Sequence, residues 1–260
     1  MEFVYYVLAG AAVGFAVGLT GVGGGSLMTP MLLMFGFPPQ VAVGTDLLYA
    51  SITKSTGIFM HARRKTINWG IVGLMAAGSL PAALATTFLL SSVFSDAKEY
   101  APLLTTSLGV MLIFTSVVLL FRNRIQRQSH EGSSAVLRSL QHHRSVWTVV
   151  MGIVLGVLVT LSSVGAGAIG TAVLLMLFPR LPSVKVVGTD LAHAVPLTLV
   201  AGLGHLFLGH VDWTLLAALL VGSIPAIYLG TRAGARLPDR ILHPILVSIL
   251  MLLGLKYAIF

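Results

Sequence analysis

The sequence predicts an all-α polytopic membrane protein built from two inverted repeats of transmembrane helices, and three observations support this prediction. First, 56% of the 260 residues are hydrophobic and only 9% are charged, whereas a soluble domain must cover its surface with polar groups. Second, long apolar stretches recur along the whole chain. Third, residues 43–46 and residues 187–190 both read Val-Gly-Thr-Asp.

Ten apolar segments follow one another along the chain. Most of them approach or exceed the roughly 20 residues that a helix needs to cross the hydrocarbon of a bilayer. Two of them, 26–36 and 168–178, reach only about half-way at roughly 1.5 Å per residue. The predicted segments are 3–20, 26–36, 39–62, 68–91, 101–121, 146–162, 168–178, 183–208, 213–232 and 240–259.

Each of the two short segments follows a run of small residues, 19–25 in the first half and 161–167 in the second. In the first run, the three successive glycines 23–25 each cost a continuous helix about 1 kcal/mol. We therefore expect a broken helix in each half, with its irregular turn inside the membrane near the midplane. Such backbone must be buried in protein or line a cavity. The alternative is a single helix that is kinked at glycine.

Basic residues fall in short loops between the apolar segments, so the net charge of +8 does not indicate a nucleic-acid partner. By the positive-inside rule these loops are cytoplasmic, and alternation then places both termini outside. We expect a multi-pass protein of the bacterial inner membrane. The longest polar loop, 122–145, is predicted to be a basic cytoplasmic linker between a first repeat, 1–121, and a second repeat, 146–260.

The two halves match at an offset of 144 residues (187 − 43), and rare residue types coincide over more than forty positions. The loop after His61 is basic, whereas the equivalent loop after His205 is neutral. The repeats should therefore be inverted, as in secondary transporters whose sites lie near the midplane. The matches are Pro38 with Pro182, 43–47 with 187–191, His61 with His205, Trp69 with Trp213, Ser79 with Ser223 and Pro81 with Pro225.

The first half carries a resemblance to a known family. The run Gly18-Leu19-Thr20-Gly21-Val22-Gly23-Gly24-Gly25-Ser26, followed by Pro30 and by the motif at 43–46, resembles the sulfite exporter TauE/SafE family of membrane permeases. The resemblance covers nearly the whole chain apart from 122–145, although the second half has Ser163 and Ala166 in place of Gly21 and Gly24. It implies a permease that moves sulfur-containing anions, such as sulfite or organosulfonates, across the inner membrane.

The small-residue runs are the predicted substrate site. Glycine lets successive backbone N–H groups converge on one point, and the positive ends of the short helices begin there. Neighbouring hydroxyl groups would add donors for an oxyanion. The alternative is close helix packing through small residues, which we expect at Gly78 and Gly222. The candidate substrate-binding residues are Thr20, Gly21, Gly23, Gly24, Gly25, Ser26, Ser162, Ser163, Gly165 and Gly167.

Of the eight acidic residues, only Asp46 and Asp190 lie inside apolar stretches. A charge at the membrane centre costs about 2.5–3.5 kcal/mol on insertion scales, so both acids need a role. Two interpretations stay open: a site for a coupling proton or sodium ion, and a structural staple at the start of segments three and eight. Lys54, whose repeat mate is Thr198, could share a cavity with Asp46 and attract an anion, pair with that acid, or snorkel.

Histidines supply further candidates for proton transfer. His193 follows Asp190 by three residues and could relay protons or simply pack. His61 and His205 lie near segment ends, where placement at the membrane interface is expected. The candidate coupling or gating residues are Thr45, Asp46, Lys54, Thr189, Asp190 and His193.

Together these features predict a transporter rather than an enzyme: small anions would be its substrates, protons its candidate coupling ion, and alternating access its mechanism. An anion channel is the alternative. An intramembrane hydrolase that uses Ser26 or Ser51 with a histidine is less favoured, because no such pair stands out in the sequence. We expect no cofactor, metal or nucleic acid, since neither ligand spacing nor a nucleotide motif is present. The expected partners are the small anion and the lipid bilayer.

Overall fold

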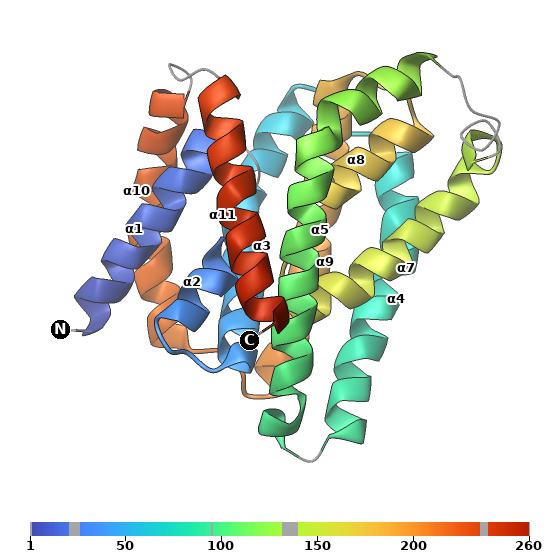
Figure 1. The fold of residues 1–260 in the computed structure, drawn as a ribbon. Coiled ribbons are helices and arrows are strands. Elements are labelled where there is room, and N and C mark those ends of the chain that lie inside the picture. Colours follow the sequence, from blue (N-terminus) through green and yellow to red (C-terminus); the bar gives the residue numbers. More distant parts are fainter. Residues whose placement is uncertain (1, 21–26, 95, 132–139, 235–238, 260) are drawn as a thin grey trace.

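The structure is a computed structural model that describes residues 2–20, 27–94, 96–131, 140–234 and 239–259, and every element within these ranges is a helix (Figure 1). This confirms the all-α prediction. Each of the ten predicted apolar segments corresponds to one helix. The helices are α1 (Glu2–Thr20), α2 (Met28–Met34), α3 (Pro39–Arg63), α4 (Trp69–Val93), α5 (Ala97–Glu131), α7 (Arg144–Ser162), α8 (Ala168–Leu177), α9 (Ser183–Phe207), α10 (Trp213–Gly234) and α11 (Asp239–Ile259).

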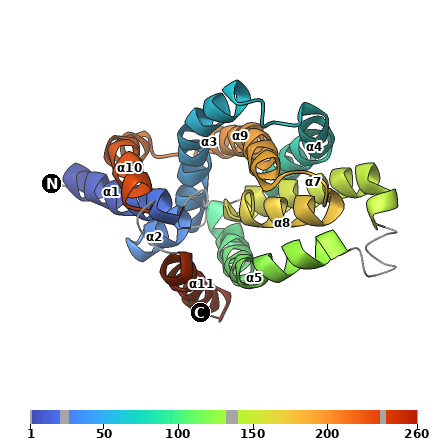
Figure 2. The same ribbon diagram turned by 90° about the horizontal axis from the view of Figure 1, so that it is seen from above.

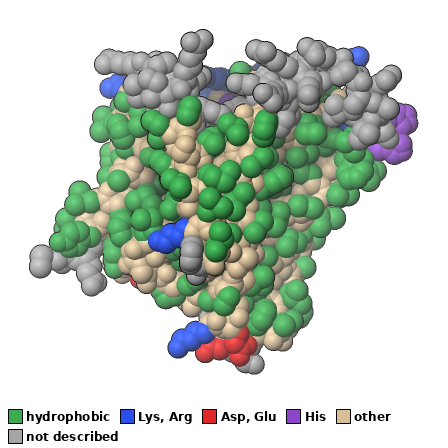
Figure 3. Space-filling view, in the orientation of Figure 1, with side chains coloured by type: hydrophobic (Ala, Val, Ile, Leu, Met, Phe, Trp, Pro, Cys, Tyr) green, Lys and Arg blue, Asp and Glu red, His purple; other side chains and the backbone are tan. Residues whose placement is uncertain are grey.

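The helices form a bundle suited to a bilayer. Five of them are long and apolar enough to cross a membrane, namely α4, residues 98–121 of α5, α7, α9 and α10. Large hydrophobic side chains such as Phe88 and Leu89 are exposed on their outer faces. Hydrophobic side chains spread over the face drawn in Figure 3, and acidic side chains lie at its lower edge. An apolar surface of this extent fits contact with lipid, so the chain is a polytopic membrane protein.

The same devices begin equivalent helices in the two halves. Pro38 and Pro182 precede α3 and α9 with φ angles of −57° and −55°, which the proline ring sets in advance. Asn68 and Asp212 precede α4 and α10, and each side chain accepts a hydrogen bond from the backbone N–H three residues on. Such caps satisfy N–H groups that have no partner within the helix. The repeat seen in the sequence is thus also a repeat of local structure.

Helices of one half pack mainly against helices of the other half. α1 packs along α10, and α7, which is the repeat mate of α1, packs along α4, the mate of α10. Along the middle of the bundle α3 packs on α9 and α5 packs on α11 (Figure 2). This reciprocal pattern is what two halves related by a two-fold exchange would produce. Their inverted orientation in the membrane stays a prediction.

Small residues allow close packing in the helix pairs α1–α10 and α4–α7. A Cβ atom at Gly78 on α4 would collide with the carbonyl oxygen of Val149 on α7, and one at Gly222 on α10 would collide with that of Val7 on α1. Backbones approach this closely only where a side chain is absent. The expectation that these two glycines serve helix packing is therefore confirmed.

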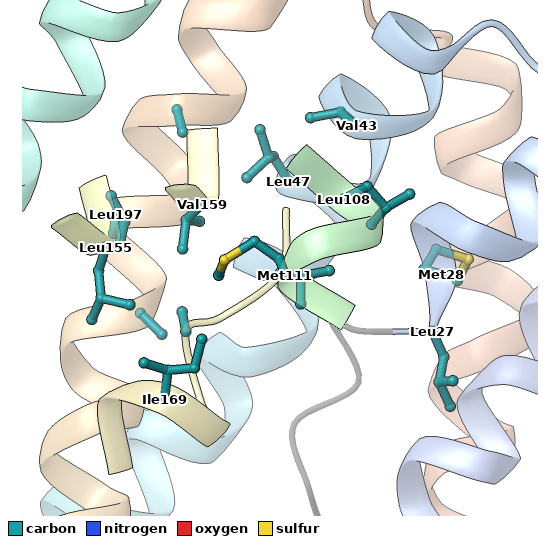
Figure 4. Packing of buried hydrophobic residues seen from close by; sticks show 14 of the residues in the cluster. Leu27, Met28, Val43, Leu47, Leu108, Met111, Leu155, Val159, Ile169 and Leu197 are labelled. Carbon is teal, nitrogen blue, oxygen red and sulfur yellow. The ribbon is translucent and has the colours of Figure 1, made fainter. Parts of the chain in front are cut away.

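The buried core surrounds α5 and the short helix α8 (Figure 4). Met111 of α5 points into the centre of this view, among Leu155 of α7, Ile169 of α8 and Leu197 of α9. A Cβ atom at Gly165 would lie only 2.7 Å from the Met111 methyl carbon. The core thus supports the turn that joins α7 to α8.

One boundary differs from the prediction. Residues 122–131 continue α5 as helix, although this stretch was expected to belong to a loop. It contains neither proline nor glycine and is rich in Arg and Gln, which are good helix formers. Apolar length marks where a helix can leave the membrane but not where the helix ends. The division into two repeats and a linker stays a prediction.

Candidate functional site

The second broken helix is confirmed by the structure. α7 ends at Ser162, Ser163 has a left-handed φ of 58°, and Gly165 and Gly167 have φ angles of 115° and 121°. α8 then begins at Ala168. Positive φ angles favour glycine, which explains the small residues of this run. Equivalent residues of the first run, Gly21, Gly23, Gly24, Gly25 and Ser26, lie outside the described residues, as does the side chain of Thr20.

The two serines of this turn differ in availability. Ser162 Oγ donates a hydrogen bond to the carbonyl oxygen of Leu158 at 2.7 Å and accepts one from the N–H of Val164 at 3.2 Å. It therefore holds the turn in shape. Ser163 is buried, and no hydrogen-bond partner for its hydroxyl is found. Of the two serines in this described turn, Ser163 is the one whose hydroxyl has no hydrogen-bond partner.

Asp46 caps the short helix of its own half. Its Oδ2 atom accepts hydrogen bonds from the N–H of Thr29 at 3.2 Å and from the Thr29 hydroxyl at 2.5 Å. Thr29 lies in the first turn of α2, where N–H groups lack partners within the helix and the dipole favours an anion. The carboxylate thus staples α2 to α3.

Asp190 does the same in the second half. Its Oδ2 atom accepts a hydrogen bond from the Thr171 hydroxyl at 3.0 Å. A Cβ atom at Gly170 would collide with the other oxygen, so the carboxylate lies directly against the first turn of α8. These contacts fit a structural role for the two acids, except that the acids staple the short helices rather than the starts of α3 and α9. The coupling role stays a prediction. The positive ends predicted for a substrate anion each face one of the protein's own carboxylates.

Lys54 lies between the two halves. Its side chain is 8% exposed and interacts electrostatically with both Asp46 and Asp190. No described residue forms a hydrogen bond or ion pair with its ammonium group at normal distance. One oxygen of each acid, Oδ1, is buried without a hydrogen-bond partner. Lys54 thus interacts with Asp190 as well as with Asp46, and the cavity expected around it stays a prediction.

The turn of the second half faces the acid of the first half. The Ser163 side chain lies near the Asp46 carboxylate, yet neither the serine hydroxyl nor Asp46 Oδ1 has a partner at hydrogen-bond distance. A buried polar group without a partner costs about 1–3 kcal/mol. Buried polar groups of this kind are suited to binding water, an ion or a small molecule.

The two threonines of the repeated motif tie the halves together. Thr45 Oγ1 accepts a hydrogen bond from the backbone N–H of Asp212 at 3.2 Å, and Thr189 Oγ1 accepts one from the backbone N–H of Asn68 at 2.9 Å. Each bond joins the motif of one half to the helix start of the other half. These two predicted gating residues therefore both lie at contacts between the halves.

The motif glycines explain the close approach. A Cβ atom at Gly188 would lie 2.6 Å from the carbonyl oxygen of Thr66 and 2.7 Å from His61 Nδ1. A Cβ atom at Gly44 would collide with the carbonyl oxygen of His210 and lie 3.0 Å from His205 Cβ. In each copy, the glycine makes room for the other half, the threonine bonds to it, and the aspartate caps a short helix.

The histidines occupy different settings. His193 is buried, and its Nε2 atom lies 2.7 Å from Ser79 Oγ on α4, which suits packing as well as proton transfer. His205 is fully buried, and its Nε2 atom donates to the carbonyl oxygen of Thr160 at 2.9 Å. The neutral loop beside His205 packs against α3 at Gly44, and the expected placement of His205 at the membrane interface stays a prediction. His61 is partly exposed, and its Nδ1 atom lies 2.8 Å from Thr66 Oγ1.

Two kinds of residue near the site were not predicted from the sequence. Thr29 and Thr171 partner the buried acids, and the 142-residue offset that aligns the two small-residue runs also aligns them. Tyr49 occupies the position of His193 in the first half and lies against Ser223, the mate of Ser79. Among the residues that the structure describes, no group of three or more His, Cys, Asp or Glu side chains could hold a metal ion.

Comparison with known proteins agrees with this architecture. The profile described as "Sulfite exporter TauE/SafE" matches residues 6–257. The chain is 37% identical to the probable membrane transporter protein YjnA of Bacillus subtilis over 96% of this chain and 97% of that protein. It is 26% identical to a probable membrane transporter protein of Methanocaldococcus jannaschii over 96% of this chain and 92% of that protein. No solved structure matches the chain. The chain therefore belongs to the sulfite exporter TauE/SafE family and is a membrane transporter.

Proposed function

We propose that the protein is a secondary transporter that moves small sulfur-containing anions, such as sulfite or organosulfonates, across the bacterial inner membrane. The observation that carries the proposal is Lys54, a buried cation between two carboxylates that come from different halves. The description of the family supports the substrate class. An ammonium group buried in the protein attracts an anion more strongly than one in water, because the surrounding protein screens charge less than water does.

The same cluster accounts for coupling to protons. Two ionised carboxylates and one ammonium group carry a net charge of −1, which repels an incoming anion. A proton on Asp46 or Asp190 removes that repulsion, so anion and proton favour each other's binding. Such mutual preference is a coupling free energy between two ligands. The anion would contact the Lys54 ammonium and the free hydroxyl of Ser163, and the proton would reside on an adjacent carboxylate.

The two threonine ties supply the elements for alternating access. If the repeats are inverted, the Thr189–Asn68 bond lies toward the cytoplasmic side and the Thr45–Asp212 bond toward the outside. Opening one side would break one tie while the other persists. Rocking of one half against the other around a central site is the general mechanism of transporters built from inverted repeats.

A hydrolase is the second candidate, because Ser79 Oγ and His193 Nε2 form a serine–histidine pair at 2.7 Å. A nucleophile of this kind also needs a group that orients the histidine, but no hydrogen-bond partner is found for His193 Nδ1. Ser79 is itself fully buried against α7. Transport is therefore the better supported function, and Ser79→Ala should leave anion flux intact.

The test is flux in liposomes that contain the purified protein. Sulfite or a simple sulfonate is placed on one side, and both anion and internal pH are followed with and without a pH gradient. We expect saturable anion movement that follows the proton gradient. Lys54→Gln should reduce the apparent affinity at least about tenfold, the equivalent of 1.4 kcal/mol. Lys185→Gln, which removes an exposed lysine at the start of α9, is the matched control and should behave as the parent protein.

Three other results would change the proposal. Saturable flux that ignores the pH gradient would remove proton coupling and leave a facilitator. Movement that does not saturate, at rates typical of open pores, would favour the anion channel. Failure of well-folded protein to move any sulfur oxyanion would refute the substrate class.

A further inference from the structure

A polar cavity lies away from the Lys54 cluster, where α4 and α7 begin and α8 ends (upper right in Figure 1). Its volume is about 580 Å³, within the range of about 300–1,000 Å³ that is usual for small-molecule sites. It is therefore large enough for a polar ligand, and it does not include the proposed anion site at Lys54. The polar residues of its lining are Asn68, Gln141, Arg144, Ser145 and Arg180.

The cavity is basic. Arg144 and Arg180 both line it, and none of the lining residues is acidic. The guanidinium group of Arg144 is positioned 5.5 Å from the centre of the Phe178 ring, in a cation–π contact at the cavity wall. No hydrogen bond or ion pair of either guanidinium group with a described residue is found. Two arginines that line one cavity suit an anion with several oxygen atoms, since arginine can offer two parallel N–H donors to a phosphate.

Backbone N–H groups supply further hydrogen-bond donors for an anion in this cavity. The residue before α7, His143, makes no capping hydrogen bond through its side chain, so the first N–H groups of this long helix remain available beside Ser145. At the opposite wall, Gln141 Nε2 donates to the carbonyl oxygen of Met176 at 3.1 Å and fixes that wall to α8. Arg144, Arg180 and the first N–H groups of α7 thus lie at the same cavity.

The surroundings indicate where the ligand comes from. Trp69 and Trp147, each within three residues of a lining residue, are 61% and 43% exposed. Tryptophan collects at the depth of lipid head groups, and Val146 and Val184 are exposed nearby. The 142-residue offset aligns Arg144 with Glu2, so the sequence does not repeat this basic position in the first half. The exposed tryptophans and valines favour a cavity at the depth of lipid head groups.

We propose that this cavity binds the phosphate head group of an anionic phospholipid from the adjoining leaflet. The phosphate would contact Arg144 and Arg180, while the acyl chains would lie along the exposed apolar surface of α7. Basic pockets between transmembrane helices on the cytoplasmic side are a known way of recognising such head groups. The backbone N–H of Asn68, in the cavity wall, is also the donor in the tie to Thr189. A bound lipid would thus steady one of the two contacts between the halves.

The test uses the three tryptophans of the chain as reporters. One variant retains only Trp147, through Trp69→Phe and Trp213→Phe, and the other retains only Trp213, through Trp69→Phe and Trp147→Phe. Each is placed in phosphatidylcholine bilayers that contain brominated phosphatidylglycerol or brominated phosphatidylcholine at equal fraction, and quenching of fluorescence is measured. Trp147 should prefer phosphatidylglycerol about thirtyfold, as expected for two arginines at the surface, while Trp213 should show little preference.

Two further variants separate a cavity from general surface charge. Arg144→Gln with Arg180→Gln should bring the preference at Trp147 down to the value at Trp213, and the two lysine replacements should retain part of it. Arg63→Gln with Lys185→Gln removes two exposed charges outside the lining and should retain all of it. Equal loss in the two glutamine pairs, or equal quenching of both tryptophans, would overturn the proposal. Relief of quenching by millimolar inorganic phosphate would show that the cavity serves a free oxyanion and would overturn its assignment to lipid.

Discussion

Replacing Gly170 by alanine tests whether the Asp190 carboxylate rests on the first turn of α8. The added Cβ atom would collide with Asp190 Oδ1 and lie 3.0 Å from its Cγ atom. Alanine is otherwise the better residue in a helix, by about 1 kcal/mol. Any loss of stability must therefore come from the collision. A shift of the carboxylate would also disturb its hydrogen bond to Thr171.

The size of the effect follows from two opposing terms. Forcing an extra methyl group into a packed site costs about 1–3 kcal/mol, and helix propensity returns about 1 kcal/mol. Gly73→Ala on α4 is the matched control, because no atom lies within 4 Å of a Cβ added there. That change should stabilise the protein by up to about 1 kcal/mol. Gly170→Ala should therefore be less stable than Gly73→Ala by about 1–3 kcal/mol.

The assay is reversible unfolding in detergent micelles, followed by tryptophan fluorescence, in a double-mutant cycle with Asp190→Ala. Once the carboxylate is absent, Gly170→Ala should become neutral or stabilising, with a coupling energy of about 1–3 kcal/mol between the two positions. Equal effects of Gly170→Ala with and without the acid would place the carboxylate elsewhere. The reasoning that Asp190 caps α8 would then be refuted, while the control would still show whether α4 behaves as an ordinary helix.

Three further changes address the contacts between the halves, each measured by thermal unfolding in detergent. Gly188→Ala should lower the stability by about 1–3 kcal/mol, because its Cβ would lie 2.6 Å from the carbonyl oxygen of Thr66; an unchanged stability would contradict this approach. Thr189→Val should cost about 1–2 kcal/mol by leaving the Asn68 N–H without its acceptor, and Thr189→Ser should recover most of it. Burial in the loop after α9 lowers the pKa of His210 below its usual 6.5, so the unfolded chain binds more protons and stability should fall as the pH drops through about 6.5. His210→Gln should make that fall shallower, and an equally steep fall would argue against this setting.

Much of the fold could be predicted because its signals are local. A helix that must cross a bilayer needs an uninterrupted apolar stretch, and a chain that must turn inside the membrane needs residues tolerant of positive φ, such as Gly165 and Gly167. The end of α5 was missed for the converse reason. Residues 122–131 are polar but helix-forming, and hydropathy alone cannot separate the end of a membrane span from the end of a helix.

The site could be predicted only in part, because its contacts are not local. Both buried acids were found, since a carboxylate in an apolar stretch is conspicuous. The ties of Thr45 and Thr189 join residues 167 and 121 positions apart, and nothing along a single chain states how two halves will pack. The repeat gave the one available clue. Residues that occur twice at a fixed offset, such as these threonines, proved to make equivalent contacts.

The difference between the halves is therefore as informative as their likeness. The duplicated residues make the structural contacts of the site. The glycines allow the halves to approach closely, the threonines form hydrogen bonds between the halves, and the aspartates cap the short helices. Lys54 has no duplicate, and its mate Thr198 donates its hydroxyl hydrogen to backbone oxygens of its own helix, at 2.9 Å from Ala194. Lys54 is not needed for these contacts between the halves, yet it interacts with both capping aspartates. We therefore relate it to the proposed substrate anion rather than to the fold. In this proposal the symmetric residues allow movement, and the single asymmetric charge selects the anion.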